Sequence, residues 1–105
     1  MDLKVSLLYF DGCPSWEPAQ SHLSDALVQV GLANHEVELR RISSLEQAEA
    51  EQFRGSPTVL FNGVDPFADP SAPVALACRV YVTDEGLRGS PTVAQLVEAL
   101  RRWTI

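Results

Sequence analysis

The chain has 105 residues, of which 46% are hydrophobic and 21% charged, a composition typical of one globular domain over residues 1–105 and not of a disordered segment. Its formal net charge of −6 argues against a nucleic-acid partner, because nucleic-acid binders usually carry a basic patch. No apolar run approaches the roughly 20 residues that cross a bilayer, so we expect no membrane partner.

The cellular location is expected to be the cytoplasm. The N-terminal segment carries an acid at Asp2 and lacks a long apolar stretch with a cleavage site, so it does not match a secretory signal. Two cysteines, Cys13 and Cys78, are too few for a disulfide scaffold, and a reducing compartment would keep both as free thiols. With two lone histidines they do not match the ligand spacing of a zinc site, so we expect no metal and no bound cofactor. The oligomeric state is left open.

The first two elements are expected to be a buried strand and an amphipathic helix. Residues 4–10 form an apolar run rich in strand formers, which Asp11 and Gly12 end. A helix follows just after Cys13, because apolar residues recur at helical spacing and Pro18 falls in the first turn, where proline is tolerated.

The middle of the chain predicts two strands, a short helix and a long loop. Residues 36–42 alternate between apolar and polar, as in a half-exposed strand, and Ser44 caps a helix that runs to about Phe53. Residues 58–61 form a third strand. Residues 64–77 hold three prolines and little pattern, which indicates a loop that is functional or a covering flap.

The last elements complete the order βαβαββα. Residues 79–83 form a fourth strand, and a final helix has Ser90 at its N-cap and Pro91 at its first position. The first three elements form a βαβ unit, whose two strands should be parallel. The pattern therefore predicts an α/β domain with a four-stranded mixed sheet and helices on both faces.

Cys13 is the strongest functional feature, because it lies between a strand end and a helix start. The unpaired N–H groups of a helix N-terminus favour the thiolate, which is the nucleophile in disulfide exchange and the ligand of soft metals. The acids Asp11 and Glu17 lie nearby and would raise the thiol pKa. The alternative interpretation is a buried, inert cysteine that only packs.

The segment LLYFDGCPSW (7–16), followed by a helix and by Ser-Pro-Thr at a strand start, resembles the thioredoxin superfamily. In that superfamily a Cys-x-x-Cys motif begins the first helix and a cis-proline opens a later strand; Cys13 matches the first cysteine and Pro57 the proline. Asp-Gly-Cys-Pro and residues 62–67 are also similar to small bacterial thioredoxin-like proteins, some of them selenoproteins. The resemblance implies a thioredoxin-like three-layer sandwich.

The motif is only half present, since Trp16 stands where the second cysteine would be. This leaves a monothiol oxidoreductase, in which Cys13 is the catalytic nucleophile on a disulfide or mixed disulfide, and a protein or glutathione is the partner or co-substrate. Trp16 either shields the cysteine or forms an aromatic wall for a ligand. The residues expected to contact substrate surround the cysteine and the cis-proline: Gly12, Pro14, Trp16, Ser56 and Pro57.

Cys78 is expected to lie far from Cys13 as a small buried residue. It precedes the fourth strand, a strand of five residues spans roughly 17 Å, and bridged cysteines need Cα atoms within about 7 Å. Pairing would require the 62–77 loop to fold back. Two other functions stay open, namely a non-catalytic binding module on the same fold and capture of a soft metal or an organomercurial by Cys13.

Overall fold

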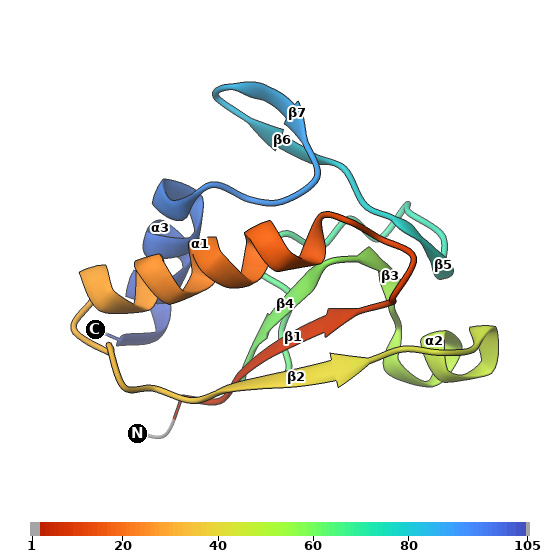
Figure 1. The fold of residues 1–105 in the computed structure, drawn as a ribbon, viewed down its shortest axis with the longest axis horizontal. Coiled ribbons are helices and arrows are strands. Elements are labelled where there is room, and N and C mark those ends of the chain that lie inside the picture. The colour runs from red at the N-terminus through yellow and green to blue at the C-terminus, as the bar shows by residue number, and fades with distance from the viewer. Residues whose placement is uncertain (1–2, 105) are drawn as a thin grey trace.

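The structure is a computed structural model that describes residues 3–104, which form three helices and seven strands (Figure 1). In chain order the elements are β1 (Val5–Tyr9), α1 (Trp16–Gln29), β2 (Val37–Arg41), α2 (Leu45–Glu51), β3 (Arg54–Ser56), β4 (Thr58–Phe61), β5 (Ala75–Cys78), β6 (Tyr81–Thr83), β7 (Gly86–Arg88) and α3 (Val93–Thr104). Within this described part of the chain, no helix combines the length and the apolar character that a membrane crossing requires.

The central sheet has the order β2-β1-β4. β1 pairs in parallel with β2, with Val5 opposite Val37, so the parallel arrangement of the βαβ unit is confirmed. On its other edge β1 pairs antiparallel with β4, with Val5 opposite Phe61. As the middle strand, β1 is buried on both faces, which explains its uninterrupted apolar sequence.

The predicted four-stranded mixed sheet is wrong, and with it the thioredoxin-like three-layer sandwich. The strands form three small sheets of three, two and two strands. The expected fourth strand shortens to β6, which pairs with β7 as a hairpin, with Thr83 opposite Gly86. Gly86 has a φ of +98°, a conformation that favours glycine, so the chain reverses locally and β6 does not extend the central sheet.

A second difference lies in the segment expected to be a loop over residues 64–77. Its last residues form β5, which pairs in parallel with β3, with Arg54 opposite Ala75 and Ser56 opposite Cys78. No periodicity marks β5, because three of its four residues are exposed and the strand covers only the edge of β3. This fold-back brings the end of the loop to the cis-proline region.

Two apolar clusters hold these elements together, and the α/β class is confirmed. In the larger cluster, Leu23 of α1 and Leu100 of α3 pack with Val59 of β4, and Figure 1 shows α1 and α3 side by side. The smaller cluster contains Leu8, Ile42, Ala48 and Phe53 and places α2 beside the ends of β1 and β2.

The helix caps agree with the sequence at one helix and differ at another. Ser44 Oγ accepts a hydrogen bond from the Gln47 N–H at 3.0 Å, as expected. α3 begins later than Ser90 predicts, because Thr92 Oγ1 accepts from the Gln95 N–H at 3.1 Å while Gln95 Oε1 accepts from the Thr92 N–H at 2.9 Å. This reciprocal pair is a capping box and fixes the start of α3.

We expect Leu100→Ala to lower the free energy of unfolding by about 2–5 kcal/mol, because the side chain is 0% exposed and its removal leaves a cavity. Leu87→Ala is the matched control: Leu87 is 66% exposed on β7, and its loss should change stability by less than about 0.5 kcal/mol. Urea denaturation of both variants measures the difference. Equal losses would contradict the placement of the core between α1, α3 and the central sheet.

Candidate functional site

Cys13 lies in the turn that links β1 to α1. Its N–H donates to the Phe10 carbonyl at 3.2 Å, and α1 begins three residues later at Trp16. The thiol donates to the Ser56 carbonyl oxygen at 3.4 Å. The residue is only 1% exposed, so the predicted position before the helix is confirmed but the sulfur is buried.

The Ser56–Pro57 peptide bond is cis, as the sequence predicts. Both residues are buried at the junction of β3 and β4. Ser56 Oγ accepts from the Phe10 N–H at 3.3 Å, which ties this junction to the end of β1. The structure therefore brings Cys13, Ser56 and Pro57 together.

The other predicted contact residues lie around this centre in different environments. Gly12 and Pro14 flank the buried cysteine and are both exposed. Trp16 is half-buried and stacks on Tyr9, with ring centroids 4.2 Å apart and an interplanar angle of 22°. This stacking holds the first turn of α1 against the end of β1.

Cys78 is neither remote nor buried, so both expectations for it are wrong. It is exposed, and its Cα is the register partner of Ser56 in the β3–β5 ladder. The next residue, Arg79, donates its backbone N–H to the Ser56 carbonyl at 2.8 Å. That oxygen is also the acceptor of the Cys13 thiol, so both cysteines lie at one peptide group.

The two thiols have opposite pKa shifts. Burial raises the pKa of Cys13, but hydrogen bonds from the Ser15 backbone and from the Cys78, Ser56 and Ser15 side chains outweigh it, and the pKa lies below the ordinary thiol value. The polar contact with Cys13, and then burial, raise the pKa of Cys78. The shifts therefore favour the thiolate on Cys13 and the protonated thiol on Cys78.

Asp11, one of the two acids expected to raise the pKa of Cys13, is paired with a basic side chain in the structure. Its carboxylate pairs with the Arg41 guanidinium at 3.1 Å, and both side chains are exposed. The donors that lower the pKa of Cys13 are instead short-range hydrogen-bonding groups. Ser15 was missed by sequence reasoning, although its position next to Pro14 in the turn before α1 was visible.

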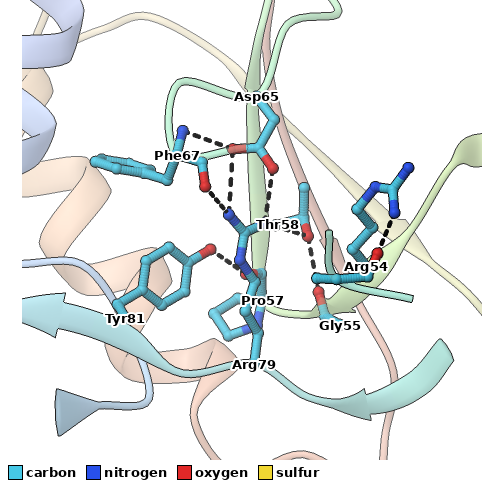
Figure 2. A network of polar contacts seen from close by, with 9 residues as sticks. Arg54, Gly55, Pro57, Thr58, Asp65, Phe67, Arg79 and Tyr81 are labelled. Carbon is cyan, nitrogen blue, oxygen red and sulfur yellow. Dashed lines mark hydrogen bonds and ion pairs between the residues drawn. The ribbon is translucent and has the colours of Figure 1, made fainter. Parts of the chain in front are cut away.

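A network of polar contacts around Arg79 fixes the end of β5, and Figure 2 shows it (the Arg79 network: Arg79, Asp65, Thr58, Phe67, Tyr81 and Pro57). The Arg79 guanidinium pairs with Asp65 at 2.7 Å, and these side chains are only 10% and 16% exposed. It also donates to Thr58 Oγ1 at 3.2 Å and lies 4.6 Å from the centroid of the Tyr81 ring. The Tyr81 hydroxyl in turn donates to the Pro57 carbonyl. The network anchors residues 65–81 across the cis-proline.

Gly55 allows β5 to approach β3 this closely. Its φ is +116°, and a Cβ at this position would lie 2.9 Å from Arg79 Cβ and 3.2 Å from the Ala77 carbonyl oxygen. No short motif connects Gly55, Asp65 and Arg79 in the sequence, so pattern reasoning could not find this part of the site.

Comparison with known proteins adds no assignment: no family model, curated protein or solved structure matches this chain. Over residues 3–104, no three or more His, Cys, Asp or Glu side chains gather in a group that could hold a metal ion. The chemistry of the site must follow from its own residues.

We expect the thiolate of Cys13 to form below the ordinary thiol pKa of about 8.5. Ultraviolet absorbance of the thiolate, followed against pH, should show this titration in the wild-type protein and not in Cys13→Ser. Because the folded-state pKa is lowered, the ionised thiol stabilises the fold above the unfolded-state pKa, and this contribution is lost as pH falls through the folded-state pKa. A stability difference between wild type and Cys13→Ser that stays constant over this pH range would contradict the shift.

We expect Asp65→Asn to destabilise the fold by about 3–5 kcal/mol, because it leaves the buried Arg79 charge without its partner. Asp11→Asn breaks an exposed pair and should cost less than about 1 kcal/mol. Chemical denaturation of the two variants provides the comparison. The Arg79 network would have no role in holding the site if both losses were small.

Proposed function

We propose that this chain is a thiol–disulfide oxidoreductase in which Cys13 attacks the sulfur of a disulfide or mixed disulfide. The observation that carries this proposal is the position of Cys13 in the turn before α1, where its thiol lies 3.4 Å from the Ser56 carbonyl oxygen. Hydrogen bonds from Ser15, Cys78 and Ser56 lower its pKa although its side chain is buried. A cysteine that only packs in an apolar environment has a raised pKa instead. The thiolate is the form that attacks a disulfide, so the surrounding donors favour reaction at neutral pH.

The site favours a small disulfide over an extended polypeptide. A polypeptide substrate would need a free backbone edge beside Ser56, but β5 already occupies the edge of β3 there. The Ser56 carbonyl oxygen accepts from Arg79 and from Cys13. A glutathione mixed disulfide can be bound through side chains alone, with glutathione as the co-substrate. Gly12 and Pro14 are the exposed candidates for contact, and Trp16, Ser56 and Pro57 would form the walls behind them.

The reaction suits a reducing compartment, and we place it in the cytoplasm. A pool of small thiols there would return an oxidised Cys13 to the thiolate after each exchange.

Capture of a soft metal is the second candidate function, because Cys78 supplies another sulfur next to Cys13. Thiolates are the preferred ligands of soft ions such as copper(I), and two sulfurs suit a two-coordinate ion. Such binding would protect both thiols from alkylation without any turnover of a disulfide.

The test is the reduction of a glutathionylated peptide with reduced glutathione as the final reductant. We expect Cys13→Ser and Cys13→Ala to lower the rate by at least about tenfold, because the ionised sulfur is lost. Circular dichroism and the unfolding midpoint serve as controls for folding. Unchanged turnover in both folded variants would reject the proposal. If the wild type shows no turnover, and Cys13→Ser binds the glutathionylated peptide as well as the wild type does, the non-catalytic binding module is favoured instead.

A further inference from the structure

Two free cysteines on different elements lie at the same peptide group. Cys78 is the register partner of Ser56, and the Cys13 thiol contacts the Ser56 carbonyl oxygen at 3.4 Å. We propose that Cys78 is the outer redox cysteine of this site, that it forms the mixed disulfide with the incoming substrate, and that Cys13 resolves it into an intramolecular Cys13–Cys78 disulfide. This inference rests on the proposed function and names the sulfur on which Cys13 acts.

The backbone holds the two cysteines in place from both sides. Ser56 O accepts from the Arg79 N–H at 2.8 Å, so the residue after Cys78 is bonded to the same oxygen as the Cys13 thiol. The buried Arg79–Asp65 pair prevents the end of β5 from moving away, and Gly55 leaves the space for the close approach. The pair is therefore positioned before any substrate arrives.

Exposure divides the roles between the two sulfurs. Cys13 is 1% exposed, whereas Cys78 is exposed, so an external disulfide can approach the Cys78 side chain without any rearrangement. Hydrogen bonds from Ser15, Cys78 and Ser56 lower the pKa of Cys13, whereas the polar contact with Cys13 raises the pKa of Cys78. Transfer of the Cys78 proton to Cys13 runs against these shifts, so the Cys78 thiolate is the minor form. It is nevertheless the form that attacks, because Cys78 is the exposed sulfur and the more basic thiolate is the stronger nucleophile.

A pocket lies on the exposed side of Cys78. Its volume is about 540 Å³, within the range of small-molecule sites, and Cys78 lines it together with Arg54, Phe67, Arg79 and Tyr81. The Arg54 guanidinium and the Asp69 carboxylate both line this pocket beside the rings of Phe67 and Tyr81, whereas the Arg79 charge is already paired with Asp65. This lining favours a small thiol compound that carries both carboxylate and ammonium groups, such as glutathione. Cys13 is not among the residues that line this pocket, which again places Cys78 at the position where a substrate is met.

The reaction balances with a small disulfide RSSR as the oxidant. Cys13 takes the proton of Cys78, and the Cys78 thiolate attacks one sulfur of RSSR, so that a Cys78–SR bond forms and RS⁻ leaves. Cys13 then gives its proton to RS⁻, and its thiolate attacks the Cys78 sulfur. The Cys78–SR bond breaks, the Cys13–Cys78 bond forms, and the second RS⁻ takes a proton from solvent. Two thiols lose two electrons in total, and RSSR gains them as two RSH.

The experiment treats the reduced full-length protein with oxidised glutathione, without added thiol, and follows the intact mass after acid quenching. The wild type should lose two hydrogens and retain no adduct. Cys13→Ser should retain a glutathione adduct on Cys78. Cys78→Ser should be modified at least about tenfold more slowly than the wild type is oxidised, because only the buried sulfur is left. The control Leu76→Ser places the same hydroxyl two residues earlier on β5, at a position that does not line this pocket, and should oxidise like the wild type.

Peptide mapping without reductant should identify the Cys13–Cys78 bond in the oxidised wild type, and Cys78→Ala repeats the test without a hydroxyl. The inference is overturned if the wild type retains an adduct or stays reduced, or if both Cys78 variants react on Cys13 as fast as the wild type. If the Cys78 variants react this fast but Cys13→Ser loses peptide turnover, the monothiol function survives and only the role of Cys78 is rejected. The proposed function itself fails only if peptide turnover is unchanged in the Cys13 variants.

Discussion

The buried ion pair between Arg79 and Asp65 is the interaction on which the site depends. Two charges in a largely buried position are stable only when hydrogen bonds replace the lost water, and Arg79 has them: its side chain donates to Asp65, Thr58 and the Phe67 carbonyl. Its backbone N–H donates to Ser56. One residue thus connects the loop, the β3 edge and the cis-proline, and the exposed cysteine before it has little freedom to move.

The environment of Cys13 shows how tertiary contacts can reverse a local trend. Burial alone would make this thiol inert, and the sequence places acids beside it. In the folded chain Asp11 forms an ion pair with Arg41. Hydrogen bonds from the Ser15 backbone and from the side chains of Cys78, Ser56 and Ser15 all lower the pKa of the Cys13 thiol, and their combined effect exceeds the desolvation of the thiolate.

Local patterns predicted what local forces determine. The apolar run of β1, its parallel pairing with β2, the Ser44 cap and the position of Cys13 before α1 all follow from neighbouring residues. The predicted four-stranded sheet failed because the strand over 79–83 found a closer partner in β7. Cys78 was misplaced because the register of the β3–β5 pair depends on Gly55, Asp65 and Arg79, which are far apart in the sequence and carry no shared motif.

The segment between Asp65 and Arg79 is anchored at both ends by their ion pair. The residues between these anchors can therefore vary in sequence and length while the positions of the two cysteines stay fixed. Residues 68, 69, 72 and 73 line the pocket from this segment, and the Arg54 contact there is to a backbone carbonyl that any residue could supply. Lengthening a closed loop is inexpensive, at about 0.6 kcal/mol for each doubling. Insertions here could therefore diversify the ligands that are accepted while the two sulfurs keep their geometry.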